Sequence, residues 1–269
     1  MNDPKEYVLT TSAPENARLR RQHDLWLEDT RNLWRRARFS RSQSLLELGS
    51  GPGYTTLDLA RYLGPTCDFT AIELSPNYAE ECKQRLKDYP NVKVLTANLL
   101  EIDLGHEKFD GIFGRWIWMF LPNVEFAVEK IVKSLKRGGT LAIQEYVNYQ
   151  AMSLSPNSMI HDTVVEAVMK SFRDSGGEPD VVKKLIPLFE ENGMEVEVLE
   201  PVGKLIRPSD PFWDWPSNFF ATYLQNLEEN RYLSRAQIET FRAEWAKAEK
   251  QKGTFWIGPT VANVIARKK

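Results

Sequence analysis

Cysteine and histidine are scarce in this chain of 269 residues, which contains two cysteines and three histidines. Cys67 and Cys82 do not have the spacing of a metal or redox motif, and one pair is too few for a disulfide framework. No apolar run approaches the roughly 20 residues of a membrane span, and the first residues lack the apolar run of a signal peptide. We therefore expect a cytoplasmic protein without a membrane partner, a disulfide framework or a cysteine-bound metal.

Excess charge of either sign is also absent. The chain has 35 Lys and Arg against 37 Asp and Glu, a formal net charge of -2. A composition so balanced gives no global sign of a nucleic-acid or membrane partner. The length allows a substantial core, either as one domain or as one domain with a large elaboration, and we favour the second.

A glycine-rich stretch is the most informative feature that the chain does contain. A short apolar run at residues 44–48 breaks into Gly49, Gly51 and Gly53, and a helical pattern with Leu59 and Leu63 on one face follows. The pattern predicts a strand, a tight turn and a helix. Glycine suits such a turn because it tolerates unusual dihedral angles and lets a ligand approach the amides at the helix start.

The spacing of these glycines separates two ligand classes. A dinucleotide fold expects Gly-x-Gly-x-x-Gly, whose third glycine would stand where this chain has Tyr54. The pattern acidic-x-Gly-x-Gly-x-Gly, starting at Glu47, resembles instead the first motif of the class I S-adenosylmethionine-dependent methyltransferases. Taken alone, it is also compatible with an ordinary strand-to-helix turn.

Two further polar positions match that family. Residues 67–72 read as a second strand ending in Glu73, about twenty residues beyond the glycines, where a Rossmann-like fold places an acid for ribose hydroxyls. Ser75 and Pro76 then start a helix. A third strand, residues 92–95, precedes Asn98. The family often has Asp there, reaching the adenine amino group, and the Asn98 amide oxygen can still accept that hydrogen bond.

The fourth and fifth strands complete the resemblance. We expect them at residues 109–113 and 140–145, joined by a helix with Val124, Val128, Ile131 and Leu135 on one face and a stop at residues 136–139. The stretch 114–122 resembles the family motif that lines the pocket between cofactor and acceptor. The resemblance implies S-adenosyl-L-methionine as cofactor, with S-adenosyl-L-homocysteine as product. The implied cofactor-binding residues are Tyr7, Gln22, Glu47, Gly49, Ser50, Gly51, Gly53, Glu73, Leu74, Asn98, Leu99, Leu100, Arg115 and Trp116.

Tyr7 and Gln22 come from the segment before the first strand. Together with Leu9, Arg18 and Leu19 they resemble the N-terminal cover of bacterial small-molecule methyltransferases, although this chain has one more residue between Leu19 and Gln22. The resemblance implies contacts with the methionine end of the cofactor. A packed aromatic ring and a solvated amide are the alternative interpretation.

The same segment is rich in arginine, and residues 14–39 read as one or two helices. A basic face of this kind binds RNA in some proteins. Asp24, Glu28 and Asp29 lie among the arginines, however, and a helix with charges of both signs is usually a solvated face. The arginines are Arg18, Arg20, Arg21, Arg31, Arg35, Arg36, Arg38 and Arg41.

The remaining chain predicts the rest of an α/β fold. We expect a helix from residue 155 that turns Met159 inward, a helix over 180–192 kinked at Pro187, a strand over 195–199, and a last strand from 255–257 and 261–266. As the family resemblance implies, this makes a Rossmann-like seven-stranded mixed sheet flanked by helices. Residues 1–269 then form a single domain, with a helical cover at 1–43, a cofactor-binding half at 44–146 and an acceptor-side half at 147–269.

An aromatic stretch marks residues 205–250 as a lid before the last strand. Residues 211–223 contain six aromatic side chains, and Ser234 with Gln237 forms a capping box for a following helix. With Trp116, Trp118 and Met119 these rings would cage an aromatic, lipid-like or cationic acceptor. Alternatively they pack the insertion onto the core or form a dimer contact, so a monomer and a homodimer both remain open.

Methyl transfer from a sulfonium is an in-line displacement that depends mainly on positioning and on exclusion of water. A hydroxyl acceptor needs a base. The candidates for catalysis are His161, Glu145 and Tyr146, and each also has a structural interpretation, as a packed histidine or a strand-end hydrogen bond. We predict methyl transfer to a small molecule without a metal. The alternatives are an RNA methyltransferase and a non-catalytic scaffold.

Overall fold

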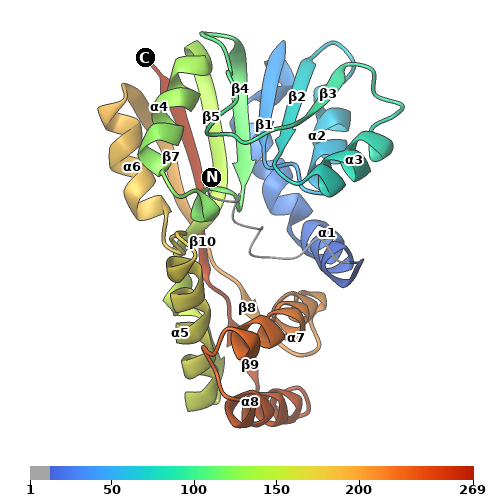
Figure 1. Ribbon diagram of the computed structural model, residues 1–269, viewed down its shortest axis with the longest axis vertical. Helices are drawn as coiled ribbons and strands as arrows, with labels where there is room; N and C mark the ends of the chain where they lie inside the picture. Colours follow the sequence, from blue (N-terminus) through green and yellow to red (C-terminus); the bar gives the residue numbers. More distant parts are fainter. Residues whose placement is uncertain (1–12) are drawn as a thin grey trace.

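The computed structural model describes residues 13–269, and a seven-stranded mixed sheet forms its centre (Figure 1). The strand order is β3-β2-β1-β4-β5-β10-β7. Strands β1 to β5 are parallel, whereas β10 is antiparallel to both β5 and β7. The predicted α/β class and mixed sheet are therefore confirmed. The strands are β1 (Ser44–Leu48), β2 (Asp68–Glu73), β3 (Val92–Thr96), β4 (Phe109–Arg115), β5 (Leu135–Asn148), β7 (Met194–Val202) and β10 (Thr260–Lys268).

Helices flank this sheet. Of the described residues before the first strand, most form a single long helix, α1 (Ala13–Arg36), which is followed by a short 3-10 helix, Phe39–Arg41. Local sequence fixes several starts. Ser75 caps α3 by accepting from the Tyr78 amide, with Pro76 in the first turn, and Asn123 caps α4 in the same way. The flanking helices are α2 (Tyr54–Leu63), α3 (Pro76–Arg85), α4 (Val124–Ser134) and α6 (Val182–Glu191).

A second group of elements lies beyond the carboxyl ends of the parallel strands, in the lower half of Figure 1. It contains three helices and a small sheet in the order β6-β9-β8. Helix α7 packs against α1, and α8 packs against α5. The members are β6 (Ser153–Ser155), α5 (Met159–Asp174), β8 (Leu205–Ile206), α7 (Asp214–Glu229), α8 (Arg235–Ala248) and β9 (Phe255–Ile257).

Part of the predicted last strand is wrong. Residues 255–257 pair with β6 and β8 as β9, and only β10 enters the main sheet. Gly258 and Pro259 separate the two strands. The Gly258 amide donates to the Lys204 carbonyl at 2.9 Å, and Pro259 has no amide to continue a ladder. The chain therefore changes sheets at this point.

Two expectations near helix ends are also wrong. Met159 is 83% exposed instead of facing inward, because α5 starts there, after the Ser158 cap, and a first-turn side chain finds no neighbour to cover it. Leu135 belongs to β5, where it pairs with Phe109, rather than to the preceding helix. The ladder shifts register between Phe109 and Gly111, so residues 136–139 bulge out instead of ending a helix.

No helix within residues 13–269 has both the length and the apolarity that crossing a bilayer requires. Cys67 and Cys82 are buried free thiols.

Candidate active site

A cavity of about 540 Å³ opens where the parallel strands end. Its walls come from helix α1, from the turn between β1 and α2, from the ends of β2, β4 and β5, and from α7. This edge is where open α/β sheets bind ligands. The cavity joins a polar region around the glycine turn to an apolar region around α7 and β9.

The three glycines of the turn have different surroundings. All have positive φ angles, +66° at Gly49, +53° at Gly51 and +87° at Gly53. A Cβ atom on Gly51 would meet nothing within 4 Å and would point into open space, whereas one on Gly53 would lie 2.7 Å from the Cys82 Sγ and 2.9 Å from its Cα. Gly51 lines the cavity and Gly53 does not. Gly51 thus leaves room for a ligand, and Gly53 leaves room for helix α3.

Glu73 braces this turn from the end of β2. Its carboxylate accepts hydrogen bonds from the Gly51 amide at 2.7 Å and from the Ser75 amide at 2.9 Å. Burial raises the pKa of Glu73, and the backbone donors oppose that shift. The side chain is 7% exposed and lines the cavity. It therefore links the glycine turn to the start of α3 at the ligand-binding edge.

Glu47, at the end of β1, has an unsatisfied oxygen beside the turn. Its Oε2 is buried and makes no hydrogen bond with another part of residues 13–269. Burial raises the pKa of Glu47 to about 7. Because the residue also lines the cavity, this oxygen is a ready acceptor for a cationic donor on a ligand.

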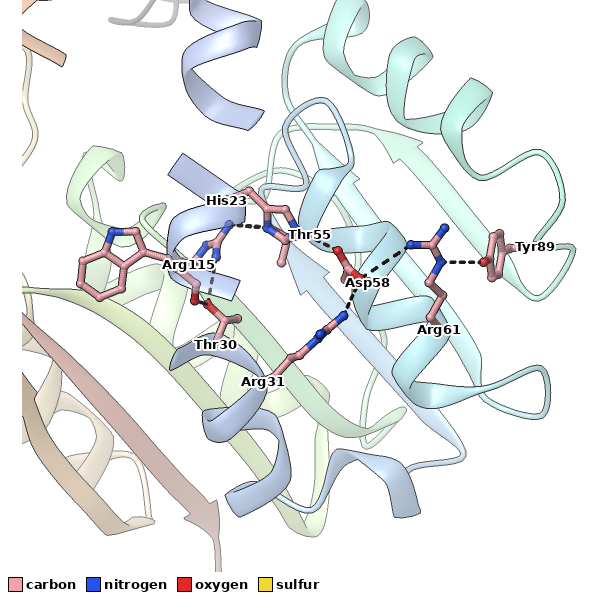
Figure 2. A network of polar contacts seen from close by, with 9 residues as sticks. His23, Thr30, Arg31, Thr55, Asp58, Arg61, Tyr89 and Arg115 are labelled. Carbon is pink, nitrogen blue, oxygen red and sulfur yellow. Dashed lines mark hydrogen bonds and ion pairs between the residues drawn. The ribbon is translucent and has the colours of Figure 1, made fainter. Parts of the chain in front are cut away.

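Arg115 stands at the end of β4 and is held by a polar network (Figure 2). Its guanidinium donates to Thr30 Oγ1 at 2.9 Å, to Thr55 Oγ1 at 2.6 Å and to His23 Nδ1 at 3.1 Å. His23 Nε2 lies 2.9 Å from an Asp58 oxygen. Burial lowers the pKa of His23 to about 4, so the ring is neutral, donating from Nε2 to Asp58 and accepting at Nδ1.

The same network ties α1 and α2 to the sheet. Asp58 also bonds Arg31 at 2.9 Å, and Arg61 reaches it at 3.8 Å. Burial lowers the pKa of Arg115 to about 10, which still leaves it charged at neutral pH. The network thus fixes a buried cation at the cavity wall.

The residues that the sequence predicts to contact adenine also line the cavity. Asn98 Oδ1 accepts from the Leu100 amide at 3.0 Å, and its second lone pair remains for a ligand donor. Asn98, Leu74, Leu99 and Leu100 all line the cavity. Gln22 lines it as well, next to Arg18, with which it hydrogen-bonds. Tyr7 lies outside the described residues.

The three residues proposed for catalysis lie in different places. Tyr146 lines the cavity, but Glu145 does not. The buried Glu145 carboxylate accepts from the Trp118 amide at 3.0 Å and from the Tyr146 amide at 3.1 Å. His161 is 1% exposed and stands behind the wall, where its Nε2 accepts from Trp256 Nε1 at 3.0 Å. Burial lowers the pKa of His161 to about 4.

The aromatic stretch divides into two groups. Trp215 and Phe219, on α7, line the cavity together with Trp256. The other four rings of residues 211–223, which are Phe212, Trp213, Phe220 and Tyr223, do not line it. Trp213 stacks on Trp245 with ring centroids 4.7 Å apart, and the Tyr223 hydroxyl bonds Ser171 at 3.0 Å. The lid thus packs onto the core with one set of rings and faces the cavity with another.

Comparison with known proteins agrees with this geometry. A family profile described as a methyltransferase domain matches residues 46–143, from β1 to β5. Residues 46–143 of this chain are thus similar to a methyltransferase domain. A malonyl-[acyl-carrier protein] O-methyltransferase from Anoxybacillus flavithermus is 31% identical over 104 residues, which cover 39% of each protein. A demethylmenaquinone methyltransferase from Staphylococcus aureus is 24% identical over 124 residues, 46% of this chain and 50% of that protein. The chain therefore spans half or less of the curated relatives it matches.

Solved structures share the fold of this chain over a longer stretch. A putative sarcosine dimethylglycine methyltransferase from Galdieria sulphuraria has a TM-score of 0.59 at 16% identity, covering 92% of this chain and 86% of that one. A geranyl diphosphate C-methyltransferase from Streptomyces coelicolor, in complex with Mg²⁺, geranyl diphosphate and S-adenosyl-L-homocysteine, has a TM-score of 0.53 at 14% identity, covering 84% and 72%. Such low identities support the fold alone.

Several cavity residues were not predicted as site residues from the sequence. His23, Thr55 and Arg18 line the cavity, and Asp58 stands behind them. His23 and Arg115 are 92 positions apart, and no local motif connects them. One available signal was the position of Thr55 in the first turn of the helix after the glycines, where polar groups face a ligand.

Two buried acids, Glu47 and Glu145, predict how the stability of the protein varies with pH. The folded-state pKa values of Glu47 and Glu145, about 7 and about 8, exceed the ordinary carboxyl value. An acid with a raised pKa stabilises fully below its unfolded pKa, and that contribution is lost as pH rises through the folded pKa. Glu145→Gln removes one such group. Its melting temperature relative to wild type should therefore rise between pH 5 and pH 8, by an amount equivalent to about 1.4 kcal/mol per pH unit at most. Differential scanning fluorimetry at matched ionic strength measures this difference in melting temperature. A difference that stays constant with pH would show that Glu145 is already ionised at pH 5.

Proposed function

We propose that this protein transfers a methyl group from S-adenosyl-L-methionine to a small molecule. The observation that carries the proposal is the glycine turn. Gly51 faces an open cavity while the unpaired Oε2 of Glu47 and the carboxylate of Glu73 flank it. Both named relatives are methyltransferases, and a protein of the same fold binds S-adenosyl-L-homocysteine.

The residues present fit this cofactor. Glu47 Oε2 would accept from its ammonium group, Glu73 from its ribose hydroxyls and Asn98 from its adenine amino group. Leu99 and Leu100 supply an apolar wall for the adenine ring. When bound, S-adenosyl-L-methionine supplies an electrophilic methyl group. The protein then has to align the acceptor with that group and exclude water.

The walls of the cavity favour a small-molecule acceptor. Helices α1 and α7 meet over the sheet edge, where Arg21 pairs with Asp214 at 2.8 Å and Trp26 packs edge-on against Trp215 at 5.0 Å. Lys204 bonds Asp29 at 2.7 Å and also lies over the Trp26 ring. These contacts make α1 and the lid segment a shared cover that suits an enclosed ligand.

The arginine-rich segment gives little support to an RNA acceptor. Five of its eight arginines are in ion pairs with carboxylates of the chain, which neutralise much of the basic face. The paired arginines are Arg18, Arg21, Arg31, Arg35 and Arg36.

A methyl-transfer assay distinguishes a small-molecule methyltransferase from an RNA methyltransferase and from a non-catalytic scaffold. S-Adenosylmethionine with an isotopically labelled methyl group is incubated with the protein and either a deproteinised small-molecule extract or purified RNA. The proposal predicts labelled low-mass product that Gly51→Val no longer makes. Labelled methyl groups found only in the RNA fraction would favour an RNA methyltransferase. Cofactor binding without label in either fraction would favour the scaffold.

A further inference from the structure

The acceptor side of the cavity is walled by aromatic rings. Trp116 stacks on Tyr146 with centroids 6.0 Å apart, and Tyr146 meets Tyr149 edge to face at 5.0 Å. Trp215 and Trp256 continue this wall from the lid side, 5.6 Å from each other. Flat apolar surfaces at these separations favour a planar, apolar ligand body over a highly hydrated one.

Two hydroxyl groups interrupt this apolar wall. Tyr146 and Tyr149 both line the cavity, and neither hydroxyl hydrogen-bonds to any other group within residues 13–269. A Tyr hydroxyl near an apolar pocket usually finds a partner. Burial raises the pKa of both phenols above the usual value, so both are neutral at physiological pH and can donate. The two cavity-lining residues thus each have a hydroxyl that can donate to a ligand.

Charge on this side is positive or absent. The carboxylates that line the cavity, Glu47 and Glu73, belong to the glycine turn and the end of β2. Arg18 and Arg115 line it too. Burial raises the pKa of Tyr146, the neighbouring Glu145 carboxyl adds to that rise, and the two guanidiniums oppose it. Burial also raises the pKa of Glu145 itself to about 8, so this acid, which does not line the cavity, is mostly neutral at physiological pH. Arg18 likewise opposes the rise that burial causes in the pKa of Tyr149, although it pairs with Glu15 at 2.7 Å. A cationic ligand would thus find no anion near the two hydroxyls, and an anion would find two donors in a positive field.

A general base is also missing from this wall, as far as residues 13–269 are concerned. His23 is the lining histidine, and its two ring nitrogens are engaged by Asp58 and by Arg115 with Thr55. The tyrosines hold their protons, and His161 stands behind Trp256. Glu47 and Glu73 line the cavity at the glycine turn, so an acceptor that must lose a proton at the aromatic wall has no group beside it there to receive the proton.

We propose that the acceptor is a planar aromatic oxygen acid, a carboxylic acid or an acidic phenol that is already ionised at neutral pH, and that Tyr146 and Tyr149 bind its oxyanion. This inference rests on the proposed methyl transfer. The acceptor loses its proton to water before binding. An oxygen–methyl bond then forms as the sulfur–methyl bond breaks, the electron pair goes to sulfur, and both charges disappear without a proton transfer to the protein. An apolar cavity favours such charge cancellation over the same step in water.

Three probes with the same naphthalene ring but different charge test whether the cavity prefers a planar aromatic anion. 2-Naphthoate, 2-naphthylmethylammonium and the neutral methyl 2-naphthoate are titrated calorimetrically into the protein saturated with S-adenosylhomocysteine, with cyclohexanecarboxylate as a non-planar control. We expect 2-naphthoate to bind at least about tenfold tighter than the other three, because a charge-assisted hydrogen bond and a stacked ring each contribute on that scale. Tighter binding of the ammonium probe or of cyclohexanecarboxylate would overturn the proposal.

Variants then locate the anion. The double variant Tyr146→Phe with Tyr149→Phe should bind 2-naphthoate about ten- to hundredfold more weakly than wild type and should bind methyl 2-naphthoate with unchanged affinity. Tyr223→Phe is the matched control, because its hydroxyl bonds Ser171 and does not line the cavity. Equal losses for both probes would mean that the hydroxyls do not bind the anion.

The role of S-adenosylhomocysteine in the assay separates this inference from the proposed function. If the cofactor's own carboxylate occupies the two tyrosines, saturation with S-adenosylhomocysteine will abolish 2-naphthoate binding that occurs without it, and the acceptor inference fails while cofactor binding stands. Failure of S-adenosylhomocysteine itself to bind would instead contradict the proposed function.

Discussion

Gly51→Val is expected to weaken S-adenosylhomocysteine binding by at least about 100-fold, equivalent to about 2.7 kcal/mol, and to leave a folded protein. The Cβ of residue 51 would meet no atom within 4 Å, so the branched side chain enters the cavity instead of the core. The backbone cost of a β-branched residue at φ +53° is on the order of 1–3 kcal/mol. Calorimetry gives the affinity, and a thermal melt gives the stability.

Gly193→Val supplies the matched control for this variant. Gly193 also has a positive φ angle, +77°, and open space at its Cβ, but it follows α6 and does not line the cavity. Both variants should lose similar stability, and only Gly51→Val should lose binding. Wild-type affinity in a folded Gly51→Val protein would show that the ligand does not approach this turn.

Glu73→Ala is expected to reduce S-adenosylhomocysteine affinity by roughly 10- to 150-fold, which corresponds to about 1.5–3 kcal/mol for a charge-assisted hydrogen bond. Part of the loss comes from the turn, because the Gly51 and Ser75 amides lose their acceptor. Glu73→Gln keeps one acceptor oxygen and should lose less. Calorimetric titration of the three proteins measures the series.

Glu125→Ala is a suitable control for Glu73→Ala. Glu125 is an exposed carboxylate in the first turn of α4 and does not line the cavity. The Glu125→Ala protein should bind S-adenosylhomocysteine with wild-type affinity. If Glu73→Ala also bound as wild type, the assignment of Glu73 to the ribose would be wrong.

The fold of residues 44–146 could be predicted because its signals are local. The run from Ser44 to the glycines, the strand ending in Glu73 and the cap at Ser75 each depend on residues that are neighbours in the chain. Hydrophobic periodicity, turn residues and capping residues therefore indicate the same elements, and such agreement makes a segment predictable.

The errors arise where tertiary contacts decide. Residues 255–257 and 261–266 are equally apolar, and only the partners of β9 and β10 separate them into two sheets. The periodicity that placed Met159 on an inner face was sound for the helix, but it could not show that Met159 lies in the first turn.

The aromatic character of residues 211–223 could be read from the sequence, but the direction in which each ring faces could not. Which rings of residues 211–223 face the cavity depends on the rotation of α7, and the structure turns Trp215 and Phe219 inward to the cavity and Tyr223 toward Ser171. His161 looked suited to catalysis from its place after the fifth strand. Its contact with Trp256 joins positions 95 apart, which no local pattern reveals.

Calorimetric titration of S-adenosylmethionine and S-adenosylhomocysteine into the wild-type protein tests the central claim most directly. We expect both compounds to bind saturably at one site per chain, with micromolar dissociation constants. Absence of heat, together with an unchanged melting temperature in the presence of either compound, would contradict it.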